Sequence, residues 1–211
     1  RKFAGHGVPP AHEAAQTLYR EAIARISPDG HAPAMGSDLF MSNLERLGLT
    51  RLFDRRVVER VINDLRLHPD ASMAVNISAR SARLDHWWAS VLSALESERA
   101  LARRLIVEIT GGIGLSDLEA SREFCAQFQQ LGCRIAIDGL GASTADLESV
   151  RSCCPDIVKL EASFVRQARQ SDVGRAGLRG RLKLCMQLAP IVVVDGIEVE
   201  DATWDKLNAL A

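Results

Sequence analysis

The chain has 211 residues, which is the length of one large domain. Its 26 Lys and Arg and 27 Asp and Glu residues give a formal net charge of −1, so the chain lacks the overall basic field of a protein that grips nucleic acid by its phosphates. With 47% hydrophobic and 25% charged residues, its composition is typical of a globular protein and excludes a mostly disordered one.

The sequence predicts a cytoplasmic domain. No apolar run approaches the roughly 20 residues that a membrane-spanning helix needs. The five cysteines are odd in number and show no C-x-x-C spacing, which argues against a disulfide framework and against a zinc site. The first residue is Arg1 rather than Met, so we expect residues 1–211 to be a single domain of a longer multidomain protein, with any membrane attachment upstream.

From residue 72 onward, short β-rich segments alternate with longer helical patterns. The expected strands are residues 72–77, 105–109, 134–138, 156–160 and 191–195. The helical patterns between them cover residues 91–103, 118–131 and 178–188. Near-continuous apolar strands separated by helices indicate an α/β protein with a buried parallel sheet. Because such connections are right-handed, the architecture is either a doubly wound sheet or a (β/α)₈ barrel.

Every expected strand carries a polar side chain at or near its carboxyl end: Asn76, Glu108, Asp138, Lys159 and Asp195. Each of them alone is typical of a turn, a helix cap or a solvated surface. Their recurrence favours the barrel, because barrel strand ends converge on one face whereas an open sheet spreads them along an edge. Convergent oxygen ligands suit a hard divalent cation such as Mg²⁺ or Mn²⁺, and a nearby lysine suits phosphate-ester chemistry or phosphate binding.

Seven short segments follow one another in order along the chain: residues 21–26 (EAIARI), 44–49 (LERLGL), 74–79 (AVNISA), 108–110 (EIT), 136–141 (AIDGLG), 156–165 (DIVKLEASFV) and 193–198 (VVDGIE). Together they resemble the motifs of the EAL domain family, the cyclic di-GMP phosphodiesterases and their non-catalytic relatives. The resemblance covers nearly the whole chain. It implies a TIM-like (β/α)₈ barrel with one atypical strand near its start, and because the chain ends at Ala211 we expect the last strand of that barrel to be missing from it.

The resemblance also implies residue roles. A first metal ion would be held by four residues: Glu21, Asn76, Glu108 and Asp138. Lys159 matches the lysine that positions the attacking water, and Arg25 matches the arginine that holds a phosphate, so both are expected at the nucleotide together with Asn76. Asp195 and Glu198 match the two acidic residues of the late motif.

Four departures from the family pattern bear on activity. Gly139 replaces an aspartate that helps to hold the second metal, and glycine offers no ligand to it. Gly111 replaces a glutamate that braces the following loop, and residues 139–144 lack the usual glycine spacing and aromatic residue of that loop. Asp195 is one methylene shorter than the usual glutamate, which is enough to disturb catalytic geometry.

Three hypotheses follow from this pattern. The first is a degenerate EAL domain that binds cyclic di-GMP as a receptor and has little or no phosphodiesterase activity. The second is an active or weakly active phosphodiesterase that opens cyclic di-GMP to linear pGpG with Mg²⁺ or Mn²⁺. The third is a scaffold for a partner protein that has lost the nucleotide, with the Trp87-Trp88 pair as a candidate exposed surface.

We also expect a homodimer or a protein partner, and we expect no nucleic-acid polymer to bind. One basic cluster is interpreted as a solvated helix face: Arg175, Arg179, Arg181 and Lys183.

Overall fold

The computed structural model describes residues 18–26, 35–110, 118–140 and 144–196. Six strands form one parallel sheet in the order β1 (Arg20–Ala22), β4 (Met73–Ser78), β5 (Leu105–Thr110), β6 (Arg134–Leu140), β7 (Ile157–Leu160) and β8 (Ile191–Val194). The five strands expected from the sequence are therefore all present and parallel. A separate antiparallel ribbon pairs β2 (Arg25–Ile26) with β3 (Met35–Gly36).

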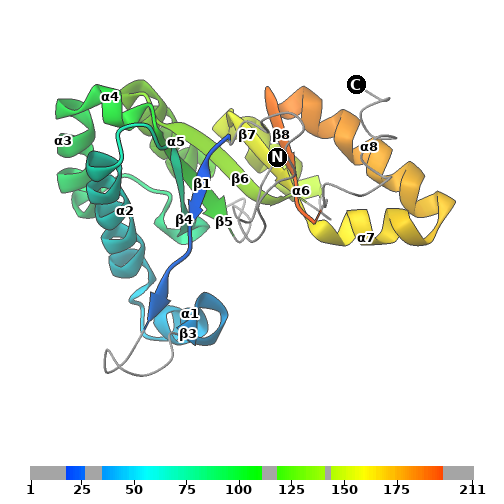
Figure 1. Cartoon of the computed structure of the whole chain (residues 1–211), viewed down its shortest axis with the longest axis horizontal. Coiled ribbons are helices and arrows are strands. Elements are labelled where there is room, and N and C mark those ends of the chain that lie inside the picture. Colours follow the sequence, from blue (N-terminus) through cyan, green and yellow to red (C-terminus); the bar gives the residue numbers. More distant parts are fainter. Residues whose placement is uncertain (1–17, 27–34, 111–117, 141–143, 197–211) are drawn as a thin grey trace.

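Helices connect the successive strands of the sheet. They are α1 (Ser37–Arg46), α2 (Thr50–Leu67), α3 (Ala89–Ser97), α4 (Arg99–Ala102), α5 (Leu118–Leu131), α6 (Thr144–Cys153), α7 (Ala162–Gln170) and α8 (Asp172–Leu188). The helix expected over residues 91–103 is two helices, because the backbone leaves the helical region at Glu98 (φ −124°, ψ 58°). Figure 1 shows α2 and α3 beyond β4 at one end of the sheet, and α7 and α8 beside β8 at the other.

The two faces of the sheet bury different side chains. On the outer face, residues such as Val75, Val107 and Val158 pack with the helices in one large apolar core. On the inner face, Ile106 and Ile157 belong to a second and smaller buried cluster. Because both faces are covered, the strands read as continuous apolar runs rather than as an alternation of apolar and polar residues.

The tryptophan pair lies against α2 and α5. Trp88 is buried, its ring centroid lies 5.3 Å from that of Phe124, and its indole N–H donates to the Ser81 carbonyl over 3.0 Å. Trp87 is half-buried, with the Arg55 guanidinium 5.3 Å from its ring centroid. The pair therefore gives no support to the hypothesis of an exposed aromatic docking surface.

Within the described residues, no helix combines the length and the apolarity that crossing a membrane requires. All five cysteines are free thiols, as the sequence predicts, and Cys154 is the exposed one among them.

Candidate functional site

The inner face of the sheet has an apolar layer and, beyond it, a polar layer. Its apolar members are Tyr19, Ala74, Ile106, Ala136, Ile157 and Val193. Two residues further along the same strands stand Glu21, Asn76, Glu108, Asp138, Lys159 and Asp195. Because strand side chains alternate with a period of two, each polar residue follows its apolar neighbour on the same face. The sheet register places Asn76 directly beside Glu108 and thus aligns the polar layer across the strands.

Lys159 occupies the centre of this polar layer. Its side chain is 0% exposed, and its ammonium bonds to Glu108, whose carboxylate is also fully buried. The Lys159 Nζ lies 3.6 Å from Asp138 Oδ2 and 4.0 Å from Glu21 Oε1. Removing an ammonium from water costs several kcal/mol, and surrounding it with carboxylates offsets this cost.

Asn76 links the first strand to this cluster. Its side-chain amide donates to Glu21 Oε1 over 2.9 Å. The structure thus brings together five of the residues singled out in the sequence: Glu21, Asn76, Glu108, Asp138 and Lys159.

The other expected site residues have different positions. Arg25 lies on β2 and is exposed. Asp195 directly follows β8 and is half-buried, and its backbone N–H donates to the Leu160 carbonyl over 3.0 Å. Gly139 is exposed and has a φ of +80°, in the left-handed region that favours glycine. Glu198, Gly111 and residues 141–143 lie outside the described residues.

A cavity of about 430 Å³ opens beside the polar layer. It is lined by Glu21, Ala22, Ile23, Ala24, Met41, Phe53, Asp54, Val57, Asn76, Ile77, Ser78, Thr110 and Asp138. Three members of the polar layer therefore border it, and α2 supplies an apolar wall. A concave site with apolar walls and a few convergent polar groups is the usual form of a small-molecule site.

Asp54 on α2 is a cavity residue that the sequence analysis missed. It is 1% exposed, and its Oδ2 accepts from the Ser78 backbone N–H over 2.9 Å and from the Ser81 hydroxyl over 2.6 Å. Burial raises the pKa of this carboxyl from 3.8 to about 6, although both hydrogen bonds act in the opposite direction. The signal was present in the sequence, because Asp54 stands four residues after Thr50 and four before Val58 on the buried stripe of α2.

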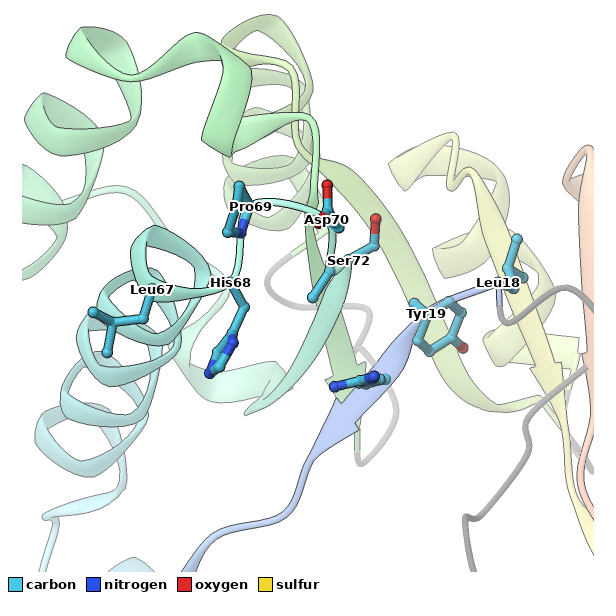
Figure 2. Close-up of a pocket in the computed structure, with 9 residues that line it drawn as sticks. Leu18, Tyr19, Leu67, His68, Pro69, Asp70 and Ser72 are labelled. Carbon is cyan, nitrogen blue, oxygen red and sulfur yellow. The ribbon is translucent and has the colours of Figure 1, made fainter. Parts of the chain in front are cut away.

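A second cavity, of about 320 Å³, lies at the opposite end of the sheet. Figure 2 shows His68 and Ser72, which precede β4, on one side of it and Leu18 and Tyr19, at the start of β1, on the other. None of the site residues expected from the sequence lines this cavity. Active sites of (β/α)₈ barrels sit at the carboxyl ends of the strands, so the cavity beside the polar layer is the candidate site.

The comparison with known proteins identifies the family. The family model of the EAL domain matches residues 11–211. The chain belongs to the EAL domain family.

Two kinds of relatives accompany this match. The chain is 25% identical over 186 residues to the probable cyclic di-GMP phosphodiesterase PdeA of Escherichia coli (strain K12), and the match covers 86% of this chain and 25% of that protein. Among solved structures, it resembles Vibrio cholerae LapD S helix-GGDEF-EAL bound to c-di-GMP, with a TM-score of 0.78, 22% identity, and coverage of 92% of this chain and 47% of that one. It also resembles the Bacillus subtilis YkuI protein, with an EAL domain, in complex with c-di-GMP and calcium, with a TM-score of 0.63, 22% identity, and coverage of 85% and 45%.

These likenesses establish the fold. The six parallel strands of this EAL domain are part of a TIM-like barrel, which confirms the predicted fold class. The chain thus spans about a quarter of the length of PdeA.

The donor set of the polar layer fits a hard divalent cation in its chemistry. Three carboxylates and one amide supply oxygen atoms, which are the ligands that Mg²⁺ and Mn²⁺ prefer. In the described part of the chain, no three His, Cys, Asp or Glu side chains are already placed to hold a metal ion. The carboxylates instead surround the Lys159 ammonium, which is the positive charge that they neutralise in this structure.

Replacing Glu108 with Gln should strongly destabilise this EAL domain. The variant leaves the buried Lys159 ammonium without its bonded carboxylate, and breaking a buried ion pair from one side costs about 3 kcal/mol or more. Urea unfolding measures the loss. The control is Asp64→Asn, which breaks the exposed pair with Arg60 and should cost less than about 1 kcal/mol. If both variants lost the same free energy of unfolding, the buried Lys159–Glu108 pair would contribute no more to stability than an exposed pair.

The raised pKa of Asp54 should make stability depend on pH. Its native pKa of about 6 lies above its ordinary value, so the native state holds this proton more tightly and the free energy of unfolding falls as pH rises from about 4 to about 6. Asp54→Asn keeps an oxygen acceptor for Ser78 and Ser81 but does not titrate. Urea unfolding at several pH values should show that the wild type loses about 3 kcal/mol relative to this variant between pH 4 and 7. Parallel pH profiles would contradict the assignment.

Proposed function

We propose that this EAL domain binds cyclic di-GMP in the cavity at the carboxyl end of its sheet and acts as a receptor with little or no phosphodiesterase activity. The observation that carries the proposal is the polar layer: Glu21, Asn76 and Asp138 border the cavity while Lys159 lies buried among their neighbours. LapD and YkuI, which share the fold, have structures with c-di-GMP bound. This chain retains five of the motif residues in the family order: Glu21, Asn76, Glu108, Asp138 and Lys159.

The cavity suits a nucleotide in shape and chemistry. Phe53, Met41 and Val57 supply apolar surface, on which a flat base can lie. Ser78 and Thr110 bring polar atoms to the same cavity. Arg25 follows the lining residue Ala24, and from there we expect its guanidinium to reach a phosphate of the ligand.

We further propose that one divalent cation, Mg²⁺ or Mn²⁺, binds with the nucleotide, held by Glu21, Asn76, Glu108 and Asp138. A bound cation of this kind supplies Lewis-acid stabilisation of the negative charge on a phosphodiester. Lys159 holds its ammonium beside these carboxylates and contributes a second positive charge from the protein. Asn76 orients Glu21 through its amide.

Four sequence features support weak or absent turnover. Gly139 has no carboxylate for a second metal, Gly111 has none to brace the following loop, and residues 139–144 depart from the usual loop sequence. Asp195 stands one methylene shorter than the usual glutamate. Hydrolysis depends on the placement of groups to a fraction of an ångström, whereas binding tolerates more.

The alternative is a weak metal-dependent phosphodiesterase, and one observation favours it. The residues proposed for the first metal are all retained, and each of the five clustered side chains contacts at least one other member of the cluster. Lys159, Asp195 and Glu198 would then carry the reaction. We expect the domain, on either reading, to work inside a longer cytoplasmic multidomain protein, as a homodimer or with a protein partner.

Calorimetric titration with cyclic di-GMP tests the binding proposal, with and without Mg²⁺ or Ca²⁺. We expect wild-type protein to bind and Arg25→Ala to bind roughly ten-fold or more weakly, because the variant loses a charge-assisted contact to a phosphate. Arg179→Ala, an exposed arginine on α8, is the matched control and should bind like wild type. An absence of heat with wild type at high micromolar ligand overturns the proposal and favours the scaffold.

Product analysis after incubation with cyclic di-GMP and Mn²⁺ separates receptor from enzyme. We expect linear pGpG to stay near the level of a protein-free control, because Gly139 and Asp195 weaken the second cation position and the late motif. Sustained pGpG production that is lost in Lys159→Met would establish the weak phosphodiesterase instead.

A further inference from the structure

One peptide group at the carboxyl end of β4 is held by side chains from two other elements. It is the peptide that joins Ile77 to Ser78. Its carbonyl accepts from the Thr110 hydroxyl over 3.2 Å, and its N–H donates to Asp54 Oδ2 over 2.9 Å. Because Thr110 belongs to β5 and Asp54 to α2, this peptide is fixed between the neighbouring strand and a helix.

The fixed peptide forms part of the wall of the candidate site. Both residues of the peptide and both side chains that hold it line the cavity: Asp54, Ile77, Ser78 and Thr110. Asn76, which lines the cavity as well, immediately precedes this peptide on β4. A displacement of the peptide would therefore move the cavity wall together with the strand end that carries Asn76.

The turn after β4 is anchored to the same carboxylate. Asp54 Oδ2 also accepts from the Ser81 hydroxyl over 2.6 Å, and the Ser81 carbonyl accepts from the Trp88 indole N–H over 3.0 Å. Ser81 is buried and is not among the described residues that line the cavity. One oxygen atom of Asp54 thus fixes both ends of residues 78–81, where the chain leaves the sheet.

The position of Asp54 on its own helix has a cost. The residue stands on the buried stripe of α2, and burying a carboxyl group is unfavourable unless hydrogen bonds compensate for the lost water. Both hydrogen bonds to Oδ2 come from residues 78–81, so the group holds the cavity wall rather than its own helix.

We propose that Asp54 is a positioning residue for the nucleotide: it fixes the Ile77–Ser78 peptide and the following turn, and thereby keeps the cavity wall in the geometry that binds the ligand. The inference rests on the proposed function and extends it to a residue that is neither a proposed metal ligand nor a proposed phosphate contact. A wall that is ordered in advance favours binding, because the ligand does not have to order it on arrival. The role requires an oxygen acceptor at position 54 and not a negative charge.

Calorimetric titration with cyclic di-GMP separates positioning from general stabilisation. We expect Asp54→Ala to bind roughly five- to ten-fold more weakly than wild type, the equivalent of about one hydrogen bond. Asp54→Asn should keep at least about half of the wild-type affinity, because its amide oxygen still accepts from Ser78 and Ser81. Ser81→Ala removes one of the two bonds without changing a residue of the cavity wall, and should weaken binding roughly two- to five-fold.

The matched control is Asp156→Ala. Asp156 Oδ2 likewise accepts from a strand backbone N–H, that of Ile135 over 2.8 Å, and from a side chain, the Gln129 amide over 3.1 Å. Because Asp156 directly precedes β7, it lies at the opposite end of the sheet, and this variant should bind like wild type even if it unfolds at a lower urea concentration. Circular dichroism verifies that each variant is folded, and Ser81→Ala provides the test if Asp54→Ala is not.

Three results would overturn the positioning role while leaving the proposed function intact. They are wild-type affinity in folded Asp54→Ala or Ser81→Ala, equal losses in Asp54→Asn and Asp54→Ala, and an equal loss in Asp156→Ala. Failure of the wild type to bind cyclic di-GMP would instead overturn the proposed function, and this inference with it.

Discussion

The buried ammonium of Lys159 is the constraint on which the sheet depends. A charge with no exposed surface is stable only when opposite charges surround it, and here the three carboxylates come from β1, β5 and β6. The register of β7 is thereby tied to three other strands. A slip of β7 by one residue would turn Lys159 into the apolar core between sheet and helices, where the described structure offers it no carboxylate. The residues proposed to bind the ligand are therefore also those that fix the alignment of the strands.

The two layers of the inner face explain where a ligand can and cannot enter. Below the polar layer, Tyr19, Ile106 and Ile157 belong to a buried apolar cluster, which separates the polar layer from the second cavity at the opposite end of the sheet. At the carboxyl end of the sheet, polar side chains line the cavity, and residues of α2 form one of its sides. The strand sequences alone separate the apolar layer from the polar layer. A polar residue two positions after a buried apolar residue lies on the same face of the sheet but nearer to the carboxyl end of the strand.

Much of this arrangement could be predicted from the sequence, and the rest depends on contacts that a sequence does not display. Apolar runs predicted five of the six strands, and their polar ends predicted four of the five clustered residues, whereas Glu21 was predicted from the family resemblance alone. The first strand has three residues, Arg20–Ala22, and pairs with β4 alone, so it is too short for a periodic signal. Asp54 was overlooked although its spacing places it on the buried stripe of α2, and its partners, the Ser78 backbone N–H and the Ser81 hydroxyl, are known only from the folded structure. The pairing of β6 with β7 shifts register between Ile137 and Leu140, around Gly139 with its positive φ, and no local sequence pattern encodes that shift.

The charge of the polar layer bears on how a nucleotide could be held there. Three carboxylates, Glu21, Glu108 and Asp138, with one ammonium, Lys159, give 1 − 3 = −2 when all four are ionised. A cyclic dinucleotide brings two further negative charges on its phosphates, so the polar layer alone would repel the ligand of the proposed function. One bound divalent cation would cancel the charge of the layer. Binding of cation and of nucleotide must then favour each other by the same free energy, whichever arrives first. If the proposed function holds, the domain would bind the nucleotide only together with the cation, because the cation removes the repulsion between the polar layer and the phosphates.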